Sequence, residues 1–198
     1  MKKVFILFLA AFVALPSFTA RAQIIEDFET NTLNWQEFAS GNREAVVKDG
    51  VLHMKSSLGD RFVYATCLAP IDFSEPFRVK ATIVDTKLDS DSKGVAVVFN
   101  YSDDYNLDAF FISKETVAFF EQSRNERVRY READFKFNKK LKEHELVLEY
   151  RNRKVSLIID DVQCLEIPYI NMEYNGFGFA VFGISQEVSI DQVEFRQM

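Results

Sequence analysis

Between Ile24 and Phe195, apolar and polar residues alternate in short runs that turn-forming residues separate. This period of two, with many aromatic and β-branched residues, predicts β-strands. The one stretch that could be helical, 132–143, has no apolar stripe. We predict strands over 24–28, 34–38, 44–48, 51–56, 61–68, 77–86, 94–101, 107–113, 116–122, 127–132, 144–151, 154–159, 162–167, 177–184 and 187–196.

Two short turns fix the local pairing of the predicted strands. Asp49-Gly50 separates EAVVK from VLHMK, and Asp160-Asp161 holds the matching place between VSLII and VQCLEI. Such residues tolerate the positive φ angles that two-residue hairpins need. The chain contains no linker, repeat or low-complexity segment, so we predict one all-β domain, an antiparallel two-sheet jelly-roll sandwich.

The segment GVAVVFNYSDDYNLDAFFIS, residues 94–113, is apolar on both faces except near its turn. If Tyr101 pairs with Leu107 across the five-residue loop SDDYN, then Asn100 lies opposite Asp108. A two-residue turn at Lys114-Glu115 would extend the sheet and place Glu121 beside Asp108. Side chains directly opposite on neighbouring strands lie about 5 Å apart at Cβ. A polar row across three strands is therefore expected.

This register predicts one core face and one face that lines a concave groove. Arg129 joins the groove if RVRYR continues the sheet, and Tyr105 lies in the loop at the end of the groove. Polar groups and rings of this kind suit a sugar, because hydroxyls need polar partners and C–H faces pack on aromatic rings. The alternative is a solvated cross-strand charge cluster. The candidate ligand-binding residues are Asn100, Asp108, Phe110, Phe119, Glu121, Arg129 and Tyr105.

The first 22 residues have the features of a signal peptide. MKK is followed by the apolar run VFILFLAAFVAL and by the cleavage site Ala20-Arg21-Ala22. Cleavage before Gln23 would leave one domain, 23–198, without a transmembrane segment, in the periplasm or secreted. Removal of Lys2, Lys3 and Arg21 changes the formal charge from −6 to −9. This acidity disfavours nucleic-acid binding, which relies on Lys and Arg contacts to phosphate.

Several segments follow one recognisable order: IIEDFETNTLNWQEF, EAVVKDGVLHMKS, the 94–113 hairpin, HELVLEYRNRKVSLIIDDVQCLEI and VSIDQVEF. In this order the chain resembles the concanavalin A-like lectin/glucanase superfamily, in its laminin-G-like branch, and there the bacterial 3-keto-disaccharide hydrolase domains. The resemblance covers nearly all of 24–196 and implies a jelly roll that acts on or binds carbohydrate.

The resemblance also implies that the first and last strands pair and that a structural calcium is one expectation. Asp27 and Asp191 would then approach each other as the candidate metal ligands. The alternative is a pair of edge carboxylates without metal. Cys67 and Cys164 either form one disulfide or remain two thiols.

Three functional hypotheses follow. The first is a non-catalytic carbohydrate-binding module. The second is a glycoside-cleaving enzyme in which Asp108 or Glu121 is a general base or metal ligand. The third is a structural or adhesive envelope protein with a protein partner. Glucanases of this superfamily carry Glu-x-Asp-x-Glu on one strand, whereas Glu145 and Glu149 here flank Val147.

Other candidate residues receive structural interpretations. His53 and His144 are expected at the surface, and Trp35 is expected in the core instead of serving as a sugar platform. The basic stretch from Arg124 to Lys142 could attract a sulfated or uronic-acid glycan, or form a solvated charged surface.

Overall fold

The computed structural model describes residues 23–57, 59, 61–84, 93–124, 126–136, 141–168 and 170–198, with the backbone alone at 126–130. The predicted signal peptide, 1–22, lies outside the described residues. Fifteen strands and no helix are found in the described ranges. Accordingly, no described helix could span a membrane.

All strand pairs are antiparallel, and they form two sheets. The nine-stranded sheet contains β1 (Gln23–Glu26), β2 (Phe38–Ser40), β3 (Arg43–Lys48), β4 (Val51–Ser56), β6 (Phe77–Val84), β11 (Glu143–Arg151), β12 (Lys154–Ile159), β13 (Val162–Pro168) and β15 (Gln186–Gln197). The six-stranded sheet contains β5 (Phe62–Leu68), β7 (Gly94–Asp103), β8 (Asn106–Ile112), β9 (Thr116–Ser123), β10 (Glu126–Asp134) and β14 (Gly176–Phe182).

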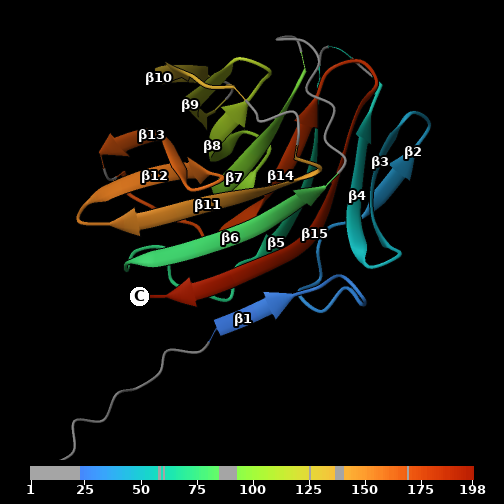
Figure 1. Ribbon diagram of the computed structural model, residues 1–198, viewed down its shortest axis with the longest axis horizontal. Coiled ribbons are helices and arrows are strands. Elements are labelled where there is room, and N and C mark those ends of the chain that lie inside the picture. Colours follow the sequence, from blue (N-terminus) through green and yellow to red (C-terminus); the bar gives the residue numbers. More distant parts are fainter. Residues whose placement is uncertain are drawn as a thin grey trace, which may run out of the picture.

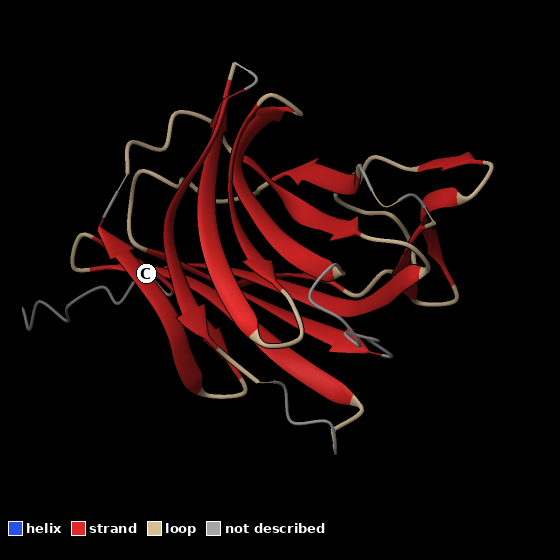
Figure 2. Cartoon of the chain, turned by 90° about the horizontal axis from the view of Figure 1, so that it is seen from above, coloured by secondary structure: helices blue, strands red, loops and turns tan. Residues whose placement is uncertain are grey.

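The strand order is that of a sandwich with many non-local neighbours. It runs β13-β12-β11-β6-β15-β4-β3-β2 in one sheet and β10-β9-β8-β7-β14-β5 in the other. β1 pairs with β15, so the expected pairing of the first and last strands is confirmed. Figure 1 shows β11, β6 and β15 in front of the six-stranded sheet, and Figure 2 shows the strong curvature of the strands. The predicted all-β sandwich is therefore confirmed.

The main core lies between the two sheets. Along β6, for example, buried and half-buried residues alternate, as the period of two predicts. Phe77, Phe177 and Phe195 are fully or almost fully buried. Burial of one such side chain stabilises the fold by about 1.5–3 kcal/mol. Trp35 is 2% exposed and stacks on Phe179 with ring centroids 5.9 Å apart, so its predicted place in the core is confirmed.

The predicted tight turns have the expected backbone. Both Asp49 and Gly50 have positive φ angles, 54° and 74°, and so do Asp160 and Asp161, at 50° and 64°. Most strand boundaries agree with the prediction to within a few residues. The exception is 34–38, because the strand itself is Phe38–Ser40. Gln36 instead donates its backbone N–H to the carbonyl oxygen of Thr66 at 2.8 Å.

The predicted register of the 94–113 hairpin is wrong by one residue. Phe99, and not Asn100, lies opposite Asp108, and the ladder then shifts before Asp103 pairs with Asn106. Asn100 occupies this irregularity with a φ of 49°. The next register is correct, since Asp108 pairs with Glu121. The predicted core and groove faces of β8 and β9 are therefore exchanged: Phe110 and Phe119 face the inter-sheet core, and Ala109 and Phe120 face outward.

The outer face of the six-stranded sheet is filled by its own side chains. The floor consists of the small buried residues Ala96, Val98, Ala109 and Ala180. Rings lie over it, and we call the whole set the concave-face cluster: Phe62, Tyr64, Ala96, Val98, Tyr101, Leu107, Ala109, Phe111, Phe120 and Ala180.

The concave-face cluster shows how strongly the sheet curls. The rings of Phe62 on β5 and Phe120 on β9 have centroids 6.2 Å apart. Four strand spacings separate these two strands, which is about 19 Å across a flat sheet. The edges of the sheet must therefore bend toward each other. The expected groove on this face is occupied by aromatic side chains.

Two further expectations are settled by burial and geometry. Cys67 and Cys164 are both free thiols, so they do not form a disulfide. The prediction that His144 lies at the surface is wrong, since it is buried, and its Nδ1 lies 2.7 Å from Asp160 Oδ2. Glu145 and Glu149 contact Lys80 and Arg78 on the outer side of the nine-stranded sheet, as expected of a polar strand face.

Candidate functional site

Asp108 and Glu121 form a cross-strand pair of acids at one end of the sandwich. The turn at Lys114-Glu115 sets their register by pairing Ile112 with Val117. Asp108 is 2% exposed, whereas Glu121 is half-buried. The expected meeting of these two carboxylates is confirmed at the level of strand register.

Asn100 joins the pair through the irregularity in β7. Its Nδ2 donates to Asp108 Oδ2 at 2.7 Å, and its Oδ1 accepts the backbone N–H of Tyr174 at 2.9 Å. The same Nδ2 lies 3.4 Å from the carbonyl oxygen of Asn171. Asn100 therefore ties a buried carboxyl group to the 170–175 segment, which crosses from β13 of one sheet to β14 of the other.

Burial raises the pKa of Asp108 to about 7, and the negative charge of Glu121 adds to this shift. The hydrogen bond from Asn100 opposes it. Desolvation disfavours the charged form of a carboxyl group, which explains the direction. At neutral pH this side chain exchanges between an acceptor-only carboxylate and a carboxylic acid that also donates.

These residues line a hollow of about 410 Å³, which we call the acidic recess. Its walls come from the ends of β7, β8 and β9 and from the 170–175 segment. Glu173 and Tyr174 close one side, and Asn106 and Asn171 add amide groups. The described lining residues include three carboxylates and no Lys, Arg or His.

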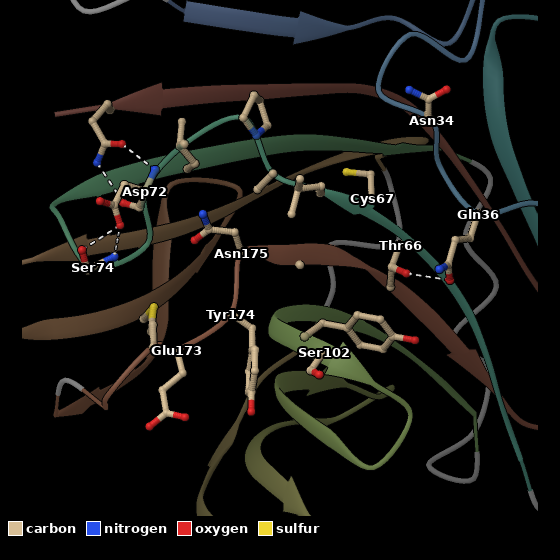
Figure 3. Close-up of a pocket in the computed structure, with 18 residues that line it drawn as sticks. Asn34, Gln36, Thr66, Cys67, Asp72, Ser74, Ser102, Glu173, Tyr174 and Asn175 are labelled. Carbon is tan, nitrogen blue, oxygen red and sulfur yellow. Dashed lines mark hydrogen bonds between the residues drawn. The ribbon is translucent and has the colours of Figure 1, made fainter.

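A second, larger hollow lies beside the recess. This open cleft has a volume of about 1010 Å³ and is lined by residues near Trp35, by the end of β5 and by the 170–175 segment. Figure 3 shows Gln36 and Thr66 on one side of it and Tyr174 and Asn175 on the other. Thr66 donates its hydroxyl to Gln36 Oε1 at 3.0 Å. We call this hollow the polar cleft.

The structure separates the predicted ligand-binding residues into three groups. Asn100, Asp108 and Glu121 come together in the acidic recess. Phe110 and Phe119 are buried in the inter-sheet core, with centroids 5.4 Å apart, so their expected place on a groove face is wrong. Tyr105 is exposed in the turn between β7 and β8 and lines neither hollow. The side chain of Arg129 lies outside the described residues.

The predicted metal ligands are two exposed residues. Asp27 and Asp191 both face solvent. Among the described residues, no group of three His, Cys, Asp or Glu side chains could hold a metal ion. The neighbouring Glu26 is fully buried and has a structural role, because its carboxylate accepts hydrogen bonds from Thr32 and from the backbone N–H of Leu33, each at 2.8 Å.

Sequence reasoning missed the 170–175 segment, which borders both hollows. Its letters, INMEYN, mix apolar and polar residues and lie between two predicted strands, where a connecting loop is expected. Only the contacts with Asn100 and the hydrogen bond from Ala69 N–H to the Asn175 carbonyl oxygen reveal its position. The sequence signal that could have indicated this segment is the length of the connection between the predicted strands 162–167 and 177–184, which has no glycine before Gly176.

The fold of this chain is the concanavalin A-like jelly roll. The carbohydrate-binding module CBM66 from Bacillus subtilis matches 82% of this chain and 92% of its own length, with 15% identity and a TM-score of 0.52. A Bacillus licheniformis β-glucanase matches 89% and 98%, with 11% identity and a TM-score of 0.62. The VIP36 exoplasmic/lumenal domain, solved with Ca²⁺ and Man3GlcNAc, matches 85% of both chains, with 11% identity and a TM-score of 0.60.

These similar structures include a binding module, an enzyme and a domain solved with a bound glycan, and at such low identity they show the fold alone. No protein-family model matches the chain, and no curated protein sequence is significantly similar to it. The fold is thus one that carbohydrate-related proteins use, and the reaction or ligand depends on the chemistry of the site.

Proposed function

We propose that this protein is an exported, non-catalytic carbohydrate-binding module, periplasmic or secreted, that holds one sugar of a glycan in the acidic recess. The observation that carries the proposal is the buried Asp108, which is hydrogen-bonded to Asn100 and paired with Glu121 beside an accessible hollow. A sugar ring presents several hydroxyl groups that both donate and accept. The carboxyl and amide groups of the recess offer matching partners.

The proposal assigns a task to each of the three residues. Glu121 accepts hydrogen bonds from sugar hydroxyls, and Asp108 accepts or donates according to its protonation. Asn100 is a positioning residue, because its amide is already committed to Asp108 and to the 170–175 segment. Tyr174, which is 41% exposed, offers a ring to the C–H face of the sugar.

The test is a glycan-array screen of the purified protein beside the variant Asp108→Asn/Glu121→Gln. Amide replacements keep the shapes of both side chains, so the fold should persist. The control variant Asp161→Asn/Glu143→Gln makes the same changes at exposed sites on the far sheet. We expect wild-type and control binding to agree and the recess variant to lose at least about tenfold in affinity, about 1.4 kcal/mol. Wild-type silence on all glycans would refute the proposal.

Calcium is examined in the same screen, with added calcium in one arm and a chelator in the other. Binding that persists in chelator would assign recognition to the protein groups alone. Binding that requires calcium would revive the expectation of a structural cation and direct attention to Asp27 and Asp191.

A second candidate function is a glycoside-cleaving enzyme of the 3-keto-disaccharide type, and the raised pKa of Asp108 favours it. A general base is most effective when its pKa lies near the working pH. Asp108, or Glu121 beside it, would then take the proton of an attacking water. Release of monosaccharide from 3-keto-disaccharides by the wild type, but not by Asp108→Asn, would establish this activity in place of simple binding.

A further inference from the structure

The polar cleft is larger than the acidic recess, and Asp108 and Glu121, the acids of the proposed sugar site, do not line it. Five separate stretches of chain line it: the residues on either side of Trp35, the end of β5 with the loop after it, the 101–102 stretch of β7, the 172–176 stretch and Gln197. A Cβ at Gly176 would collide with the carbonyl oxygen of Tyr101. Gly176 and Tyr101 are paired in the β7–β14 ladder, so the two strands are in close contact where both line the cleft.

The lining of the polar cleft is rich in groups that donate and accept hydrogen bonds. Asn34, Gln36 and Asn175 are exposed amides that line it, and Tyr174 lies on the same side as Asn175, across from Gln36. Amide groups pair with both halves of a hydroxyl, and an aromatic ring packs on an apolar C–H face. This combination fits carbohydrate better than it fits an apolar ligand.

The charges of the cleft select among carbohydrates. Its described lining residues include the carboxylates of Asp72 and Glu173 and no Lys, Arg or His. Asp72 Oδ1 accepts hydrogen bonds from the backbone N–H and the hydroxyl of Ser74, at 2.8 and 2.7 Å, which holds it in the charged form. A sulfated or uronic-acid glycan would meet these like charges without a compensating cation.

The two hollows are neighbours along the 170–175 segment. Glu173 and Tyr174 line both of them. A ligand with one sugar in the recess would have its next sugars at the cleft. The concave-face cluster blocks the alternative path along the outer face of the six-stranded sheet.

We infer that the polar cleft, bounded by Gln36, Thr66, Tyr174 and Asn175, is a binding site for the further residues of a neutral oligosaccharide. The inference rests on the proposed function and adds to it a second subsite, a ligand class and a minimum ligand size. Besides its polar groups, the cleft is lined by Leu68, Ala69, Pro70, Ile71 and Met172, which offer apolar surface to the C–H faces of the sugars.

The test measures affinity by calorimetry for neutral gluco-, xylo- and manno-oligosaccharides, from mono- to hexasaccharide, and for oligogalacturonate and heparin oligosaccharides. The cleft variant is Gln36→Ala/Asn175→Ala, which removes two exposed amides that line the cleft and not the recess. Its matched control, Asn42→Ala/Gln163→Ala, removes two exposed amides elsewhere. Unfolding midpoints of all variants verify that the fold is kept.

We expect affinity for a neutral series to rise with chain length, and the cleft variant to lose about tenfold or more on the longer members. The control variant should bind as the wild type does. The shortest ligands should be insensitive to the cleft variant, because they occupy the recess alone.

Three results would overturn the inference while leaving the proposed function in place. The first is normal binding of long oligosaccharides by the cleft variant when the Asp108→Asn/Glu121→Gln variant loses this binding. The second is equal affinity of the wild type for mono- and hexasaccharides. The third is selective binding of the anionic glycans by the wild type. Absence of binding to every probe by the wild type would instead overturn the proposed function together with the cleft.

Discussion

The carboxyl group of Asp108 acquires a pKa of about 7 on folding, and this makes stability depend on pH in a definite direction. In the unfolded chain the same carboxyl group has the ordinary pKa of an aspartate, 3.8. The folded state thus binds more protons between these two values, so stability falls as pH rises from about 4 to about 7 and then levels off.

Asp108→Asn removes this dependence, because an amide does not ionise. At about pH 8 we expect the variant to be more stable than the wild type by up to about 4 kcal/mol, and at about pH 4 we expect nearly equal stability. Urea unfolding at both pH values measures the difference. An Asp108→Asn effect that is identical at the two pH values would show that Asp108 ionises normally in the folded protein.

Asn100 combines an unusual backbone with two side-chain contacts, and substitutions can separate the two. Asn100→Gly accepts the positive φ but loses the hydrogen bonds to Asp108 and Tyr174, whereas Asn100→Ala loses the bonds and strains the backbone. We expect a loss of about 1–2 kcal/mol for Gly and about 1 kcal/mol more for Ala, measured by urea unfolding. Equal losses for both variants would mean that the φ angle costs nothing.

At the scale of elements, the strands were predictable because their hydrophobic period and their turn residues agree. The β8–β9 hairpin was placed correctly from a two-residue turn, and with it the Asp108–Glu121 pair. The register predicted for the β7–β8 hairpin is wrong by one residue. Asp103 caps a short turn there by accepting the backbone N–H of Tyr105 at 2.8 Å and the side-chain amide of Asn106 at 3.0 Å.

Because this turn pairs Asp103 with Asn106, the residues between Phe99 and Asp103 do not fit the regular ladder, and β7 is irregular at Asn100. Both faces of β7 and β8 are apolar, so the hydrophobic pattern could not distinguish two registers that differ by one residue. For this reason the sequence predicts Phe110 and Phe119 on the groove face, although both lie in the inter-sheet core. The site residues nevertheless meet, because Asn100 follows Phe99 in the irregular part of β7 and donates its Nδ2 to Asp108 Oδ2.

The concave-face cluster should behave as a small second core. Phe62 packs on Phe182 with centroids 4.9 Å apart and also contacts Phe111 and Phe120. We expect Phe62→Ala to destabilise the protein by about 2–3 kcal/mol, somewhat less than for a fully buried Phe. Denaturant unfolding gives the value, and Phe62→Leu, which keeps most of the apolar volume, should lose less.

For ligand binding the same variant should behave differently. Because Phe62 lines neither hollow, the folded Phe62→Ala protein should keep its glycan affinity. New binding by Phe62→Ala along the outer sheet face would show that the rings had been obstructing a latent groove.

On the scale of the whole molecule, the two hollows of the candidate site lie at one end of the sandwich and not on a sheet face. The sheets themselves are occupied: one face of each forms the core, the outer face of the six-stranded sheet is filled by rings, and the outer face of the nine-stranded sheet carries ion pairs such as Lys154–Glu166. Open hollows remain where the 170–175 segment crosses between sheets. No local pattern encodes this crossing, because its position depends on contacts between residues more than 70 positions apart.

Trp35, the only tryptophan of the chain, gives the molecule a built-in optical reporter. The indole is buried against Phe179, and among the described residues its Nε1 has no hydrogen-bond partner. Its fluorescence should therefore be blue-shifted in the native protein and move to the red when the sheets separate. Since the next residue, Gln36, stands at the rim of the polar cleft, a bound oligosaccharide should change the emission intensity, and the protein would signal occupancy of its own cleft without any label.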